Sequence, residues 1–264
     1  MGLIDVDDFL TQPKARAFRL EVEPGSRLAI MGRSATGKSR LLQAVEGVAK
    51  RGIKVHFPTI SALSGRATPQ QLVKPGGSDL AAVVLSTLGL WDVRKTTMAN
   101  LSESQRRAAL FASVLHVREG VILLDDDILD RLDPWSRLGA VESLLALPND
   151  VAILVVTNDP TVGEKFPRML ILGSKGLLFE GEPSALLTGM APIEYTINTQ
   201  DREAVRAMVE PFQLEIASTI EGIRFSAREN QNVAVDLLLK GYGTIESVMV
   251  KSPTFAEALR DLDS

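Results

Sequence analysis

The sequence contains no cysteine and only two histidines, His56 and His116. These shortages exclude disulfides and thiolate metal sites and argue against a histidine-based zinc site. Long apolar runs are missing too, because stretches such as VAILVV (151–156) fall far short of the roughly 20 residues that span a bilayer. Excess positive charge is also absent, since the formal net charge is −4. We therefore expect a cytosolic chain that binds no nucleic acid.

The length of 264 residues and the hydrophobic content of 45% fit one main domain and a smaller one. Strand-like runs at 18–22, 27–32, 121–124 and 151–156 alternate with helix-like runs at 39–50, 80–90, 105–117 and 141–150, and 168–181 resembles a closing hairpin. This alternation predicts an α/β domain with a mainly parallel sheet over residues 1–188.

The pattern changes near Gly189. The order from there is strand, helix, two strands, helix (232–243), strand and final helix, which is the ferredoxin-like split β-α-β-β-α-β order. We therefore predict a small ferredoxin-like α+β domain over residues 191–264. It carries no glycine-rich loop and no clustered acids, so we assign it no chemistry. Dimer contact or regulation is expected by fold analogy alone.

The stretch GRSATGKS (32–39) fits G-x-x-x-x-G-K-[ST], with a strand before it and a helix after it. Its glycines let backbone N–H groups point at phosphate oxygens, and the helix N-terminus adds a positive dipole. The lysine supplies a cation to the β- and γ-phosphates, and the serine supplies a hydroxyl to Mg²⁺. An ordinary glycine turn is the alternative. The predicted phosphate-binding residues are Gly32, Arg33, Ser34, Ala35, Thr36, Gly37, Lys38, Ser39 and Arg40.

The stretch VILLDDD (121–127) predicts a buried strand that ends in acids. Asp125 at the carboxyl end of that strand is a candidate to hold Mg²⁺ together with Ser39. A solvated acidic turn is the alternative for the acids alone. Together with the phosphate loop, they predict a P-loop nucleotide-binding protein.

The order LSESQRRAALFASVL, VILLDDDILDRLDP and VTND resembles that of ATP-binding cassette (ABC) ATPases over roughly residues 1–188. The resemblance implies ATP and Mg²⁺ as cofactors and two cassettes that sandwich two ATP molecules head to tail. Leu132–Asp133 would then belong to the loop that crosses the dimer interface. The signature residues that would face the partner's phosphate loop are Ser102, Glu103, Ser104 and Gln105.

Two further assignments follow from the resemblance and leave alternatives open. Phe9 is the candidate for the aromatic residue that stacks on adenine, or else a core phenylalanine on the first strand. The glutamine that links the site to a membrane partner is replaced by Thr59 if VHFPT aligns with the strand before it. Otherwise Gln70 or Gln71 takes that position.

The chain departs from the family at positions that serve hydrolysis. The family's signature usually reads LSGGQ, whereas Glu103 and Ser104 stand in place of both glycines. Asp126 replaces the glutamate that polarises the attacking water, and Asn158 replaces the switch histidine. These two residues are the catalytic candidates. A carboxylate displaced by about 1 Å can lower a rate roughly a hundredfold, so we predict ATP binding with slow hydrolysis.

The resemblance implies the ATP-binding subunit of a membrane transporter. Such a subunit forms a homodimer, or a heterodimer with a second ABC ATPase, on the cytoplasmic face of the membrane. The dimer pairs with separate integral membrane subunits. The alternative is a catalytically weak cassette that acts as an ATP-gated structural or regulatory subunit. In either case we expect reduced ATPase activity, that is, slow hydrolysis of ATP to ADP and phosphate.

Overall fold

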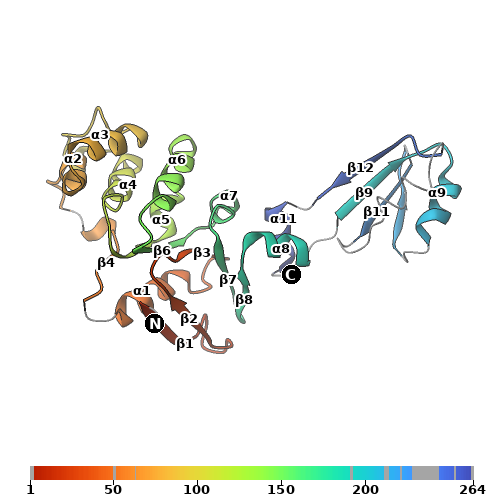
Figure 1. Ribbon diagram of the computed structural model, residues 1–264, viewed down its shortest axis with the longest axis horizontal. Coiled ribbons are helices and arrows are strands. Elements are labelled where there is room, and N and C mark those ends of the chain that lie inside the picture. Colours follow the sequence, from red (N-terminus) through yellow and green to blue (C-terminus); the bar gives the residue numbers. More distant parts are fainter. Residues whose placement is uncertain are drawn as a thin grey trace. The chain divides into compact units, whose positions relative to one another are not determined.

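The computed structural model of the chain describes residues 3–49, 52–62, 64–190, 193–210, 214–220, 222–227, 244–252 and 254–262. The chain divides into two compact units, Met1–Pro183 and Ser184–Ser264 (Figure 1). From the sequence alone the change was expected between 188 and 191. In the structure it falls at the start of α8 (Pro183–Met190).

The first unit contains a six-stranded sheet in the order β4-β5-β6-β3-β7-β8. Its strands are β3 (Arg27–Gly32), β4 (Val55–His56), β5 (Gly120–Leu124), β6 (Val151–Val156), β7 (Arg168–Gly173) and β8 (Gly176–Gly181). The first five pair in parallel, and β7 and β8 form an antiparallel hairpin. The mainly parallel α/β sheet and its closing hairpin are thus confirmed.

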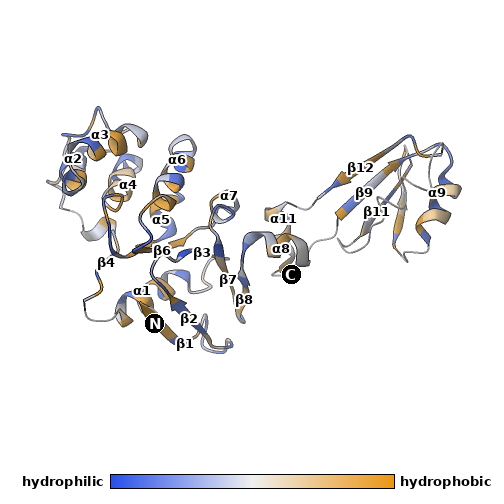
Figure 2. Ribbon diagram, in the orientation of Figure 1, coloured by the Kyte–Doolittle hydropathy of each residue, from blue (hydrophilic) through white to orange (hydrophobic). Residues whose placement is uncertain are grey.

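The sheet forms here because its central strands are apolar on both faces. All six residues of β6 are buried, and the strand is hydrophobic throughout (Figure 2). Helix α1 (Lys38–Val48) packs its Leu41, Leu42 and Val45 into the same core. Parallel strands place their carboxyl ends at one edge, so the segments that follow β3, β5 and β6 lie close together there.

A smaller antiparallel pair, β1 (Ile4–Phe9) and β2 (Phe18–Val22), also packs into this core. Between β4 and β5 the chain is helical, with α2 (Pro69–Val73), α3 (Ser78–Thr87) and α4 (Glu103–Ala112) packed on one another (Figure 1). Short 3₁₀ turns cover Ile60–Ala62, Lys74–Gly76 and Met98–Asn100. The remaining helices of this unit are α5 (Asp126–Leu129), α6 (Pro134–Leu145) and α7 (Pro160–Gly163).

The second unit contains a four-stranded antiparallel sheet in the order β10-β11-β9-β12. Its described elements are β9 (Ile193–Asn198), α9 (Arg202–Val209), β10 (Ile216–Ser218), β11 (Gly222–Ala227), β12 (Ser247–Lys251) and α11 (Phe255–Leu262). This strand order agrees with the split motif, but the helix expected over 232–243 lies outside the described residues. The ferredoxin-like assignment therefore stays a prediction. Within the described ranges, no helix is both long enough and apolar enough to cross a bilayer.

Candidate nucleotide site

The predicted phosphate loop joins β3 to α1, and two of its glycines have conformations that other residues rarely adopt. Gly32 has φ of 139°, and a Cβ added there would lie 2.2 Å from the carbonyl oxygen of Leu172. Gly37 has φ of 89°, and its added Cβ would meet the carbonyl oxygen of Thr11 at 3.0 Å. Glycine at both ends therefore allows the loop to fold tightly against its neighbours.

Between these glycines three residues of the loop are exposed. Arg33, Ser34 and Ala35 are exposed, whereas Thr36 is buried and donates its hydroxyl to the carbonyl of Arg33 at 2.8 Å. Ala35 has φ of 63°, in the left-handed region. Alternation of right- and left-handed residues turns successive N–H groups toward one point, which is the geometry of an anion-binding nest.

Lys38 begins α1, and its side chain is only 6% exposed. Its Nζ donates to the carbonyl oxygens of Gly32 at 2.7 Å and Arg33 at 3.0 Å, so the ammonium lies over the backbone of the loop. Burial lowers the pKa of Lys38, and the nearby carboxylates of Asp126 and Asp125 oppose that shift. A desolvated ammonium beside a helix N-terminus suits a phosphate oxygen.

Ser39 and Asp125 meet, although 86 positions separate them in the sequence. The Ser39 hydroxyl donates to Asp125 Oδ1 at 3.1 Å. Asp125 also accepts the backbone N–H of Asp126 at 3.0 Å. Burial raises the pKa of Asp125, while the Ser39 hydroxyl partly offsets the rise. A hydroxyl and a carboxylate at this distance are hard oxygen ligands, so the pair fits Mg²⁺ held directly or through water.

The two catalytic candidates are also in contact. The side-chain amide of Asn158 donates from Nδ2 to Asp126 Oδ2 at 2.7 Å. Asn158 follows β6 and Asp126 follows β5, so the parallel sheet brings them to one edge. An asparagine can orient a carboxylate in this way but carries no proton that titrates near neutral pH.

Asp130 fixes the segment that carries Asn158, and sequence reasoning missed it. Its Oδ1 accepts the hydroxyl of Thr157 at 2.5 Å and its Oδ2 accepts the backbone N–H of Asn158 at 2.7 Å. Burial raises the pKa of Asp130. Thr157 is completely buried, so its hydroxyl depends on this acceptor. In the sequence, Asp130 is only one more acid shortly after Asp125, Asp126 and Asp127, so nothing marked it as a support for Asn158.

The four signature residues lie at the start of α4. Ser102 caps the helix, accepting the N–H of Gln105 at 3.2 Å, while Gln105 Oε1 accepts the N–H of Ser102 at 3.0 Å. This reciprocal capping box fixes the entry of the helix. Ser104 lies between them in the first turn, so its Cβ belongs to a rigid part of the chain.

Glu103 forms an ion pair within its own chain. Its Oε1 lies 2.5 Å from Arg107 Nη1, one helical turn later, and this hydrogen bond lowers the pKa of Glu103. Arg107 is buried and also donates from Nε to the backbone carbonyl of Asp127 at 2.6 Å. The signature helix is thus linked to the segment beside Asp126, and the charge of Glu103 is compensated.

Phe9 and the interface loop have well-defined surroundings. Phe9 is 8% exposed, with its ring edge-on to Phe18 at 5.6 Å between centroids. Stacking on a base would require that ring to be uncovered, so its adenine role remains a prediction. Leu132 is buried, and Asp133 caps α6 by accepting the N–H groups of Trp135 and Ser136.

The three candidates for the membrane-linking position lie in two settings. Thr59 follows β4, whose neighbour β5 leads to Asp125, so Thr59 leaves the sheet on the same side as the site. Its hydroxyl lies 3.2 Å from that of Ser61. Gln70 and Gln71 lie on α2, where Gln71 completes a capping box with Thr68. Gln71 is thereby occupied, and the assignment of this position among the three residues stays a prediction.

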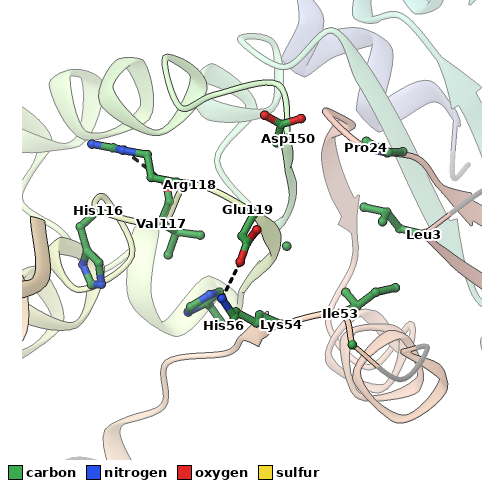
Figure 3. A pocket seen from close by; sticks show the side chains of 12 residues that line it. Leu3, Pro24, Ile53, Lys54, His56, His116, Val117, Arg118, Glu119 and Asp150 are labelled. Atoms are coloured by element: carbon green, nitrogen blue, oxygen red, sulfur yellow. Dashed lines mark hydrogen bonds and ion pairs between the residues drawn. The ribbon is translucent and has the colours of Figure 1, made fainter.

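A large open cavity of about 640 Å³ lies elsewhere, before β5 and β6 begin (Figure 3). Its lining includes His56 and His116 and the ion pair between Lys54 Nζ and Glu119 Oε1 at 2.5 Å. Burial lowers the pKa of both histidines. The strand directions place this cavity at the sheet edge opposite the phosphate loop, so it is not part of the nucleotide site.

Comparison with known proteins agrees with this geometry. Residues 15–128, which include the phosphate loop and Asp125, match the family model described as ABC transporter. This chain carries an ABC transporter ATP-binding domain. The resemblance to ABC ATPases found in the sequence motifs is confirmed for this domain.

Two curated ABC relatives and one solved structure show the extent of the likeness. A putative ABC transporter ATP-binding protein of Streptomyces avermitilis is 29% identical over 199 residues, covering 63% of this chain and 75% of the relative. The aliphatic sulfonates import ATP-binding protein SsuB of Cupriavidus necator is 32% identical over 193 residues, covering 63% of each. Other relatives are covered over only 54% of their length.

The fold of ABC cassettes is matched as well. The dimeric, post-hydrolysis structure of the ATP-binding cassette MJ0796 bound to ADP and Pi superposes with a TM-score of 0.53 at 18% identity. The match covers 69% of this chain and 97% of that one. At this identity, the likeness establishes the cassette fold alone.

Proposed function

We propose that this chain is the ATP-binding subunit of an ABC-type membrane transporter that binds Mg-ATP between two ATPase subunits. One observation carries the proposal: Ser39 Oγ lies 3.1 Å from Asp125 Oδ1, next to Lys38 at the end of a glycine-bounded loop. These groups supply a hydroxyl, a carboxylate and a cation where a nucleoside triphosphate and its metal need them.

The residues divide the work of the reaction. The phosphate loop and Lys38 bind and orient the triphosphate, while Asp126 accepts a proton from the attacking water and Asn158 orients its carboxylate. Bound Mg²⁺ would neutralise charge that develops on the phosphate oxygens. Asp126 reaches one methylene less far than the family's glutamate, and Ser104 adds a Cβ where the family has glycine. We therefore propose that hydrolysis is slow.

The partners are a second ATPase subunit and separate integral membrane subunits, on the cytoplasmic face of the membrane. The dimer of the MJ0796 cassette supports the first, and the import functions in the relatives' names support the second. Trp135 is 94% exposed, and it lies two residues after Asp133, which we predict to belong to the interface loop. Its indole could anchor a subunit contact, since tryptophan is enriched in such positions.

A second candidate function is a catalytically weak cassette that serves as an ATP-gated structural or regulatory subunit. The combination of Ser104, Asp126 and Asn158 favours it, because all three depart from the family where hydrolysis takes place. Co-purification distinguishes the two functions. A transporter subunit purifies with a polytopic membrane protein, whereas a structural subunit purifies without one.

The binding test is a calorimetric titration of the purified chain with Mg-ATP beside a Lys38→Ala variant. The wild type should bind, and the variant should lose at least about a hundredfold in affinity, because a charge-assisted contact to phosphate is removed from a desolvated site. Equal affinity of the two proteins would contradict the proposed function. An Arg19→Ala variant, which removes a cation from an exposed ion pair on β2, is the matched control.

A further inference from the structure

The first turn of α1 contacts two different parts of the chain. Ser39 reaches Asp125, as described above. The segment that follows β1 lies against the same turn, because the carbonyl of Thr11 approaches Gly37 and accepts a hydrogen bond from Arg40 Nη1 at 3.5 Å. One neighbour, Asp125, is therefore acidic and suited to the metal, and the other is the segment around Thr11 that follows β1.

Phe9, the aromatic residue at the end of β1 near Thr11, is covered by other side chains. Phe9 is 8% exposed, belongs to the hydrophobic core and has Phe18 against it. The guanidinium carbon of Arg40 lies 5.8 Å from the centroid of the Phe9 ring, within the range of a cation–π contact. Arg40 itself is exposed. The planar group that this region offers to a ligand is therefore the guanidinium of Arg40, supported by the Phe9 ring.

A nucleoside triphosphate has a fixed order of parts. Its γ-phosphate must approach Asp126 for hydrolysis, and the metal must lie at Ser39 and Asp125. The α-phosphate and the nucleoside then leave the loop away from the acids. Arg40 directly follows Ser39 on α1 and leans toward Thr11 and Phe9. Its guanidinium thus lies beside the path that the nucleoside takes.

We propose that Arg40 forms the stacking surface for the nucleotide base, in place of an aromatic ring, with Phe9 as its support. This inference rests on the proposed Mg-ATP binding and extends it to the base. Guanidinium planes stack on bases, and stacking tolerates different bases because every base has a π-face. The affinity of the site should accordingly depend on the presence of a base and only weakly on the identity of that base. ATP and GTP should bind with similar affinity.

Arginine also carries a charge that could act on the α-phosphate alone, and Arg40→Lys separates the two roles. Lysine keeps the charge but has no plane to stack. The probes are Mg-ATP, Mg-GTP and inorganic tripolyphosphate, which has the charge and no base. Arg94, whose guanidinium lies 4.2 Å over the Trp91 ring in another region, supplies the matched control Arg94→Lys.

Equilibrium titration of the full chain should show that Arg40→Lys weakens ATP and GTP roughly tenfold and leaves tripolyphosphate within about twofold. Phe9→Leu, which keeps the core apolar, should weaken ATP less than Arg40→Lys does. Thermal unfolding of each variant checks that the fold is retained. Arg94→Lys should change none of the three affinities.

Three results would overturn the proposal. Arg40→Lys could leave ATP affinity unchanged, which would make Arg40 a simple phosphate cation, or it could weaken ATP and tripolyphosphate by the same factor, which would mean that the guanidinium acts on phosphate and not on the base. Phe9→Leu could weaken ATP more than Arg40→Lys, which would return the base to Phe9. Failure of the proposed function looks different, because a wild type that binds neither ATP nor tripolyphosphate would lack the phosphate site itself.

Discussion

Lys38 and Asp126 belong to two parts of the candidate site that are held in different ways. Lys38 is almost completely buried, and two backbone carbonyls of its own loop bind its ammonium. Asp126 lies at the start of a four-residue helix and is held by the side chain of an exposed asparagine. Backbone partners persist when the sequence changes, whereas a pair of side chains requires both members.

The two parts also differ in how they match the motifs expected of an ABC ATPase. The phosphate part retains its glycines, its lysine and its serine, and its shape depends on backbone angles. At the positions predicted for hydrolysis, Asp126 and Asn158 stand where the resemblance leads us to expect glutamate and histidine, and the two side chains form a hydrogen bond of 2.7 Å. We therefore predict that substitutions in the phosphate part leave hydrolysis-related groups intact, and that substitutions in the hydrolytic part leave phosphate binding intact.

The largest separable effect is expected at the metal position. Asp125→Asn should lower Mg²⁺ affinity roughly 10- to 100-fold, because an amide cannot supply the negative charge that faces the cation. Binding of ATP in the presence of EDTA should change little. Isothermal titration with and without Mg²⁺ measures both values. Asp127→Asn, at an exposed neighbouring carboxylate, is the control, and a loss of metal-free ATP binding in Asp125→Asn would contradict the assignment.

A smaller effect is expected at Asp130, which holds the segment that carries Asn158. Asp130→Ala removes the acceptor for the buried Thr157 hydroxyl and for the Asn158 N–H, so stability should fall by about 1 to 3 kcal/mol. ATP affinity should stay within about twofold, and turnover measured in the Asp126→Glu background should fall, because Asn158 is no longer fixed. Thermal unfolding, titration and an ATPase assay test these three points.

The exposed Asp92 provides the comparison for that variant, since Asp92→Ala should leave stability and turnover unchanged. If Asp130→Ala weakened ATP binding as strongly as it weakened turnover, the two parts of the site would be coupled.

The smallest effect is expected inside the phosphate loop. Ala35 has φ of 63°, which costs about 1 to 2 kcal/mol for a residue with a Cβ. Ala35→Gly removes this strain but adds freedom to the unfolded chain, so we expect a net gain of at most about 1 kcal/mol. ATP affinity should be retained. The same exchange within α1, Ala44→Gly, should instead lower stability by about 1 kcal/mol, and denaturant unfolding compares the two.

The parts that were predictable from the sequence are those encoded locally. The phosphate loop is one contiguous segment between a strand and a helix, and the parallel strands are continuous apolar runs such as β6. The ion pair of Glu103 with Arg107 also spans a single helical turn and could have been found from spacing.

The remaining features depend on which segments the sheet brings together. The contact between Asp126 and Asn158 and the anchoring of Thr157 by Asp130 join segments that follow different strands. The burial of Phe9 and the position of Arg40 over its ring depend on how β1 packs against α1. No periodicity in the sequence reports such contacts.

The most direct test of the account is the steady-state ATP turnover of the purified chain beside Asp126→Glu, with Lys38→Ala as the blank. The account predicts wild-type turnover close to the blank and a gain of roughly tenfold or more in Asp126→Glu, since the added methylene restores the reach of the carboxylate. Brisk wild-type turnover that Asp126→Glu does not increase would contradict it. Asp126 would then be a fully competent base, and the claim of reduced hydrolysis would fail.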